Sequence, residues 1–166
     1  MHKTLALLRL MRPANIVTAV SDILAGIAIS GYFSGAYSLY PILLLVTATI
    51  GLYGGGVVFN DVFDAELDSI ERPERPIPSG IITKNEAGLL GAILLLAGIV
   101  TATCVRGFSA VSALLSVAIA LASLIYDRWG KHHALLGPLN MGLCRGLNLL
   151  LGMSIVPAAV SQYWYL

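Results

Sequence analysis

The chain has 166 residues, of which 57% are hydrophobic and only 11% are charged, and its formal net charge is +1. A typical soluble domain is about 25% charged, so a water-soluble globular fold would have too little polar surface here. The small net charge also argues against nucleic acid as a partner, because phosphate binding needs a clear surplus of Lys and Arg. The composition therefore predicts a multi-pass protein embedded in the lipid bilayer, with room for about five spans of roughly 20 residues each.

Five apolar runs are long enough to cross a bilayer, and none has the strict two-residue alternation of a membrane β-barrel. Backbone N–H and C=O groups find no water in lipid, so each run is expected to be a helix. The prediction is an all-α transmembrane helical bundle that forms one domain over residues 1–166. The expected spans are Asn15–Phe33, Tyr40–Phe59, Ala87–Val105, Phe108–Tyr126 and Leu135–Val156.

The basic residues predict how the bundle is oriented. Five spans place the N-terminus and the connections after the second and fourth spans on one side, together with eight of the ten Lys and Arg residues. The opposite side has Arg106 alone, and such a bias marks the cytoplasmic side. We expect a cytoplasmic N-terminus, and the plasma (inner) membrane if the source is bacterial. The eight residues are Lys3, Arg9, Arg12, Arg72, Arg75, Lys84, Arg128 and Lys131.

A cluster of acidic side chains follows the second run directly. If that helix continues, 100° per residue places Asp61, Asp64 and Asp68 within an arc of about 60°. Asn60 lies beside this face and Glu66 lies opposite it. Like charges at this spacing repel one another, and Mg²⁺ would relieve the repulsion because it binds carboxylate oxygens that it shares with substrate phosphates. The alternative is a solvated acidic loop that binds nothing.

The segment Asn60–Asp68 resembles, position for position, the first aspartate-rich motif of the UbiA superfamily of intramembrane prenyltransferases. Three other places are similar to that family in the same order along the chain. They are Arg12-Pro13-x-Asn15 before the first span, Glu71 to Gly80 as the family's Arg-Pro-x-x-Ser-Gly loop, and Tyr126 followed by Lys131. From Tyr126 through Gly137–Asn140 to Arg145 and Gly146, the chain is most similar to the bacterial branch called EboC.

The resemblance implies a helical bundle around a lipid-accessible cavity that holds an allylic prenyl diphosphate with Mg²⁺. It implies that Asp61, Asp64 and Asp68 are the catalytic, metal-binding residues. Loss of diphosphate would create an allylic carbocation, which an aromatic or other lipophilic acceptor attacks while apolar walls exclude water. The family has about nine spans and a second aspartate-rich motif. We therefore expect this chain to be an N-terminal portion, which lacks half of the metal site that activity needs.

Other polar residues are candidates for substrate binding. Arg145 lies about ten residues into the fifth span, and a charge at that depth usually faces a cavity or a partner. We expect it to contact the diphosphate or substrate; the alternatives are that it extends to the membrane surface or pairs with Asp22. Arginine and lysine on the cytoplasmic side either bind phosphate or contact anionic lipid. The expected substrate-binding residues are Asn15, Asn60, Arg72, Arg75, Tyr126, Lys131, Arg145 and Asn148.

Two functions remain open at this point. One is a UbiA-type prenyltransferase. The other is a non-catalytic membrane carrier or assembly partner for a lipid-linked metabolite, which the intramembrane charges Asp22 and Arg145 would suit. Two glycine pairs, Gly51 with Gly55 and Gly142 with Gly146, have the small-xxx-small spacing that is typical of close helix packing.

Overall fold

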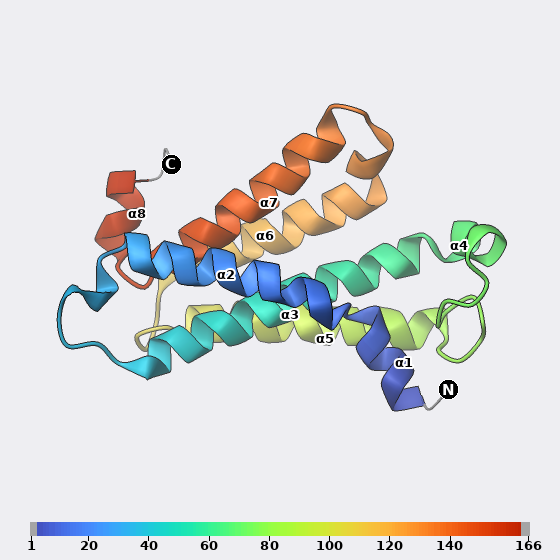
Figure 1. Cartoon of the computed structure of the whole chain (residues 1–166), viewed down its shortest axis with the longest axis horizontal. Helices are drawn as coiled ribbons and strands as arrows, with labels where there is room; N and C mark the ends of the chain where they lie inside the picture. Colours follow the sequence, from blue (N-terminus) through green and yellow to red (C-terminus); the bar gives the residue numbers. More distant parts are fainter. Residues whose placement is uncertain (1–2, 164–166) are drawn as a thin grey trace.

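A computed structural model describes residues 3–163, which form eight α-helices and two short 3₁₀ helices with no β-strand in this part of the chain (Figure 1). The all-α prediction is confirmed. The five long helices correspond to the five expected spans. The elements are α1 (Lys3–Leu10), α2 (Pro13–Ile29), η1 (Tyr32–Ser34), α3 (Leu39–Phe63), α4 (Ala65–Glu71), α5 (Lys84–Thr103), α6 (Ala110–Arg128), η2 (Gly130–His132), α7 (Leu136–Met153) and α8 (Pro157–Tyr163).

The long helices differ in how well they suit a membrane. By length and composition α3, α5 and α6 can each cross one, and the pair α1 and α2, bent by 41°, would be a fourth crossing. α7 has 18 residues, or about 27 Å at 1.5 Å per residue, but Asn140, Arg145 and Asn148 make it more polar than the others. It nevertheless packs beside α2 and α6 in the same bundle.

The bend between α1 and α2 is made at Arg12. This residue has left-handed backbone geometry with φ 47°, and Pro13 starts α2. A proline suits this first position because its missing N–H would have no partner inside the helix. The bend lets the Arg12 side chain reach the end of α3, where it donates a hydrogen bond to Asp61.

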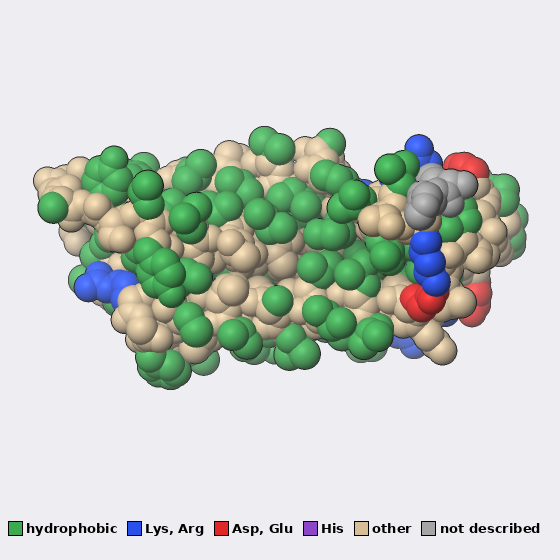
Figure 2. All heavy atoms as spheres, turned by 90° about the horizontal axis from the view of Figure 1, so that it is seen from below, with side chains coloured by type: hydrophobic (Ala, Val, Ile, Leu, Met, Phe, Trp, Pro, Cys, Tyr) green, Lys and Arg blue, Asp and Glu red, His purple; other side chains and the backbone are tan. Residues whose placement is uncertain are grey.

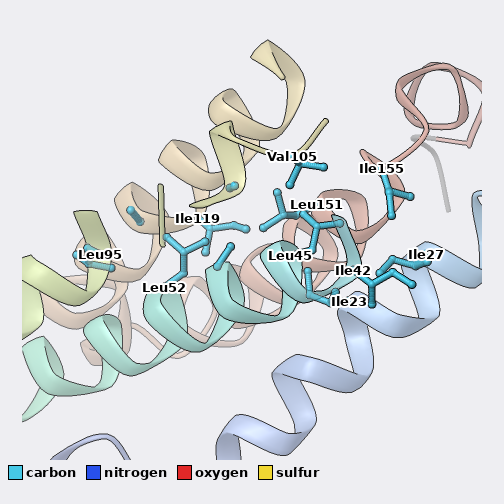
Figure 3. Packing of buried hydrophobic residues seen from close by; sticks show 13 residues of the cluster. Ile23, Ile27, Ile42, Leu45, Leu52, Leu95, Val105, Ile119, Leu151 and Ile155 are labelled. Atoms are coloured by element: carbon cyan, nitrogen blue, oxygen red, sulfur yellow. The ribbon is translucent and has the colours of Figure 1, made fainter. Parts of the chain in front are cut away.

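The centre of the bundle is apolar and draws on all five long helices (Figure 3). Ile23 of α2, Leu45 and Leu52 of α3 and Leu151 of α7 are almost completely buried. In lipid, helices associate through close packing because there is no water to expel from between them. The tight centre therefore fixes how α2, α3, α6 and α7 surround the site described below.

Glycines permit the closest helix contacts. A Cβ added to Gly51 of α3 would lie 2.7 Å from the carbonyl oxygen of Leu94, and one added to Gly98 of α5 would lie 2.9 Å from that of Ala48. A Cβ added to Gly55 would be similarly close, at 2.9 Å from the carbonyl oxygen of Gly91. The packing prediction is confirmed for Gly51 and Gly55.

The same prediction is wrong for Gly142 and Gly146. A Cβ at either position would meet no atom within 4 Å. Instead, α7 makes its close contact with α2 through Gly152, where an added Cβ would lie 3.0 Å from the Ile23 Cα. The spacing of small residues thus marked the right helix but the wrong part of it.

Charge separates the two ends of the bundle. Figure 2 shows hydrophobic side chains over the long middle of one face, with the acidic and most basic side chains gathered at the end where α1 and α4 lie. We call this the charged end; it comprises α1 with the following residues 11–12, residues 60–83 and residues 129–135. It contains the predicted aspartate motif and the loops that were expected on one side of the membrane.

Candidate active site at the charged end

The aspartate motif is not one continuous helix. α3 ends at Phe63, Asp64 has φ −85° and ψ 0°, and a new short helix, α4, begins at Ala65. The expectation that Asp61, Asp64 and Asp68 share one face of an extended helix is therefore wrong. The break separates Asp64 from the other two carboxylates, which lowers the like-charge repulsion that a continuous helix would impose. Glu66 is almost fully exposed to solvent, away from these carboxylates.

Asp61 and Asp68 converge on a single guanidinium group. Arg75 Nη1 lies 3.3 Å from Asp61 Oδ1 and 2.6 Å from Asp68 Oδ2. Arg12 Nη2 approaches Asp61 Oδ1 at 2.5 Å, and Arg72 Nη1 lies 3.8 Å from Asp68 Oδ1. Both carboxylates are buried, so their charges need these partners. The turn at residues 72–80 thus folds back to place a cation between two acids that are seven residues apart.

Asp64 has its partner on a different element from the other two aspartates. Its Oδ1 accepts a hydrogen bond from Lys131 Nζ at 2.5 Å, and both side chains are half-buried. Lys131 belongs to η2, just after α6. This bond ties the end of α3 to the connection between α6 and α7. We call Asp61, Asp64 and Asp68 with Arg12, Arg75 and Lys131 the ion-pair cluster.

The three acidic side chains of the ion-pair cluster do not gather into one set of metal ligands. Within residues 3–163, no three His, Cys, Asp or Glu side chains lie close enough together to hold a metal ion. Each aspartate of the motif has a positively charged partner instead. The donor set itself consists of hard carboxylate oxygens, which Mg²⁺ favours, and two of them already face one shared positive charge.

A cavity of about 490 Å³ opens beside the cluster, between α2, α3, α6 and α7. Arg12 and Asn60 connect the two, because both line the cavity while Arg12 contacts Asp61 and Asn60 precedes it. Polar groups lie where the cavity meets the charged end and again farther along it, around Asp22 and Arg145. Apolar side chains such as Leu52, Val57 and Ile119 form other parts of its wall. The space suits a molecule with one polar and one apolar part.

Five of the predicted substrate-binding residues line this cavity, and the rest do not. Arg72, Arg75 and Lys131 belong to the charged end, where they contact the aspartates. The structure therefore brings the predicted residues into two adjoining groups. Those that line the cavity are Asn15, Asn60, Tyr126, Arg145 and Asn148.

Arg145 and Asn148 lie farther along the cavity with intramolecular partners. Arg145 donates from Nη2 and Nε to the two oxygens of Asp22 at 2.7 and 3.1 Å, which is the structural alternative that the sequence left open. Asn148 accepts a hydrogen bond from Thr49 at 2.8 Å and donates one to the carbonyl oxygen of Ala19, also at 2.8 Å. These bonds connect α7 with α2 and α3 through the polar part of the bundle.

Two residues at this site were not predicted as functional. Arg12 was named only in a motif and among the basic residues of one side, and Asp127 was not singled out. Asp127 is buried, lines the cavity and accepts a hydrogen bond from Asn60 Nδ2 at 3.0 Å. Its position next to Tyr126, in the last turn of an apolar helix, was the available signal, because carboxylates inside spans are rare and usually functional.

Comparison with known proteins identifies the class of this helical bundle. Residues 19–166 match the UbiA prenyltransferase family. The chain belongs to that family, as the motifs indicated.

The chain is similar to archaeal enzymes named digeranylgeranylglyceryl phosphate synthase. It is 32% identical over 160 residues to the one from Methanothrix thermoacetophila, which covers 96% of this chain and 58% of that protein. It is 34% identical over 134 residues to the one from Methanosarcina barkeri, covering 81% and 45%. A solved structure reported for digeranylgeranylglyceryl phosphate synthase in membranes is 31% identical with a TM-score of 0.85, covering 96% of this chain and 57% of that one.

The chain thus spans about half the length of the curated relatives it matches. The similarity extends over nearly the whole chain and agrees in sequence and in fold. Assignment to the EboC-like branch stays a prediction.

Proposed function

We propose that the protein is an intramembrane, Mg²⁺-dependent prenyltransferase, which moves a prenyl group from an allylic prenyl diphosphate to a lipophilic acceptor. One observation carries the proposal: two buried carboxylates, Asp61 and Asp68, face one shared positive charge beside a cavity with a polar end and apolar walls. A prenyl diphosphate has the same division into a charged head and an apolar tail. We place the charged end on the cytoplasmic side of the membrane.

In this proposal Asp61 and Asp68, which already converge on one cation, would hold Mg²⁺, and Asp64 would join them after giving up its bond to Lys131. Their carboxylate oxygens fit the ion's ligand preference, and the position of the Arg75 guanidinium between two of them supports binding of a cation there. When bound, Mg²⁺ would neutralise the diphosphate and favour its departure. Arg75 and Lys131 would then exchange a carboxylate partner for a phosphate oxygen, which Arg and Lys also bind well.

The cavity would supply the rest of the reaction environment. Asn15, Asn60 and Tyr126 would orient the diphosphate end, and Leu52, Val57 and Ile119 would surround the prenyl chain. An apolar wall keeps water away from an allylic cation, which water would otherwise capture. Arg145 and Asn148, already bonded within the bundle, would shape the far part of the cavity where the acceptor or the prenyl chain lies.

The test is product formation from a radiolabelled prenyl diphosphate by the full-length protein in membrane vesicles with Mg²⁺. Removal of one metal ligand or one charge-stabilising group typically costs about 10²–10³-fold in kcat, so Asp61→Asn and Asp64→Asn should each lose at least that much. Glu66→Gln is the matched control in the same segment, because its side chain is exposed and outside the cluster. Its activity should equal that of the wild type.

Equal, Mg²⁺-dependent product formation by the wild type and by both aspartate variants would refute the proposal. The rival function, a carrier or assembly partner for a lipid-linked metabolite, predicts that ligand protects the cavity from labelling without any turnover. Detection of prenylated product would exclude that rival as the whole account.

A further inference from the structure

Asp127 differs from every other acidic residue that lines the cavity. The cavity wall contains two carboxylates, Asp22 and Asp127. Both oxygens of Asp22 are bonded to Arg145. Asp127 is buried, and among the described residues it has no positively charged partner within ion-pair distance. Asp61, Asp64 and Asp68 each have at least one such partner. Burying a carboxylate without a cation is costly, so this position requires an explanation.

The surroundings of Asp127 place it at the reacting end of the cavity. Its Oδ1 accepts a hydrogen bond from Asn60 Nδ2 at 3.0 Å, and no described donor is bonded to Oδ2. The charged groups of Lys131, Asp64 and Arg12 are near enough to act on the carboxylate, and Cys144 of α7 is a further titratable neighbour. Asn60 immediately precedes Asp61 of the ion-pair cluster, so Asp127 lies next to the group that would bind the diphosphate.

We propose that Asp127 is a catalytic residue, the proton acceptor for the transfer step; this inference rests on the proposed prenyltransferase function. The bond between the prenyl C1 and the diphosphate oxygen breaks, and its electron pair leaves with the diphosphate. A new bond forms between C1 and the attacking atom of the acceptor. The hydrogen on that atom leaves as a proton, which Asp127 Oδ2 receives. No oxidant or further reactant is needed.

Asp127 suits this task better than the other acids of the site. A general base must have an unoccupied oxygen within reach of the reacting atom. Asp61, Asp64 and Asp68 are each paired with a basic side chain, and in the proposed function their free oxygens bind the metal. Asp22 is fixed by Arg145. The bond from Asn60 also fixes the orientation of the Asp127 carboxylate, so that Oδ2 is left for the acceptor.

Asp127→Asn is the decisive variant, because its amide oxygen can still accept the Asn60 hydrogen bond while its basic site is lost. General-base catalysis contributes typically 10²–10⁴-fold, so kcat should fall by roughly that factor. The KM for the prenyl diphosphate should stay within about threefold of the wild type. The wild-type rate should decline as the pH falls and the base becomes protonated, and the variant should lack this decline. A residue that only holds Asn60 in place would leave the shape of the pH profile unchanged.

Glu74→Gln is the matched control, since Glu74 is an exposed acid of the cytoplasmic loop outside the site; its kcat and pH profile should equal those of the wild type. Asp127→Ala is a second test of the proposal if Asp127→Asn fails to fold. Formate, a small carboxylate, should restore turnover to Asp127→Ala by at least tenfold.

Three outcomes separate the claims. An inactive wild type refutes the prenyltransferase proposal itself. An active wild type with an equally active Asp127→Asn overturns only the role of Asp127. Failure of formate to restore any turnover in Asp127→Ala also overturns it.

Discussion

The polar groups at the charged end and those in the middle of the bundle have different kinds of partner. At the charged end, three acids are matched by basic side chains from three other elements, and some of these bases are substantially exposed. In the middle, Thr49 and Asn148 are bonded to each other in a buried position, and close glycine contacts lock the helices. The difference suggests that the first region can exchange partners when a ligand arrives, whereas the second maintains the shape of the cavity.

The largest expected effect is at the charged end and concerns activity. Lys131→Ala removes the partner of Asp64 and a candidate phosphate contact, so activity should fall by about 10²-fold or more, as for other groups that stabilise developing charge. The free energy of unfolding should fall by about 1–3 kcal/mol, because the substitution leaves the mostly buried Asp64 carboxylate without its partner. Prenyl transfer and unfolding in detergent are measured on the same preparation.

Lys84→Ala is the control for that experiment. Lys84 is also basic and near the charged end, but it is exposed and 4.0 Å from the exposed Glu66, so neither quantity should change. If Lys131→Ala unfolds readily and keeps its activity, the two regions do not differ in the proposed way.

The second effect tests the middle of the bundle through stability. Gly98→Ala would place a Cβ 2.9 Å from the Ala48 carbonyl oxygen and 2.9 Å from the Leu52 N. Because these are backbone atoms of α3, they cannot turn aside, and the variant should lose about 1–3 kcal/mol of unfolding free energy. Gly142→Ala meets nothing and should be neutral or slightly more stable, since Ala favours the helix. Equal effects of the two substitutions would contradict close packing at the α3–α5 contact.

The sequence predicted the spans because the apolar runs alone determine where lipid-compatible helices can form. It did not predict the break at Asp64, which brings this acid to Lys131, a residue 67 positions away. Helical periodicity describes one segment by itself and contains nothing about a partner on another helix. For the same reason Gly142 and Gly51 looked alike, although only Gly51 faces a neighbouring helix.

Prediction of the candidate site from the sequence had the same limit. The Asn60–Asp68 motif and the residues around Arg145 were visible as unusual polar groups in an apolar chain. Which of them would pair with each other was not visible. The sequence left Arg145 with three explanations, and three-dimensional contact with Asp22 decided its partner. Asp127 was overlooked because its special property is that no cation among the described residues is within ion-pair distance of it, which only packing reveals.

The third prediction concerns the ion pair of Asp22 and Arg145, which lies beside the Asn148 hydrogen bonds in the middle of the bundle. Asp22→Asn should lower the unfolding free energy by about 1 kcal/mol, the upper range for a pair with one solvent-accessible partner. Arg145 is that accessible partner. The double variant Asp22→Asn with Arg145→Gln should lose less than the sum of the single variants, because each single change leaves one charge unpaired. Simple additivity in this cycle would show that the two residues do not stabilise the bundle through their pairing.

The smallest expected effect is the most specific for exchange of partners at the charged end. Arg75 places its positive charge between Asp61 and Asp68, so Mg²⁺ must compete with it. Arg75→Gln removes the charge while keeping hydrogen-bond donors, and Mg²⁺ without substrate should then bind about threefold more tightly, or about 0.6 kcal/mol. The measurement is the rise of the thermal unfolding midpoint with Mg²⁺ concentration, because a ligand that binds only the folded state stabilises it. Lys84→Gln serves as the matched control and should titrate like the wild type. An unchanged or weaker Mg²⁺ response in Arg75→Gln would mean that Arg75 does not occupy the place of the metal, and that the carboxylates of this cluster serve only to hold the loop.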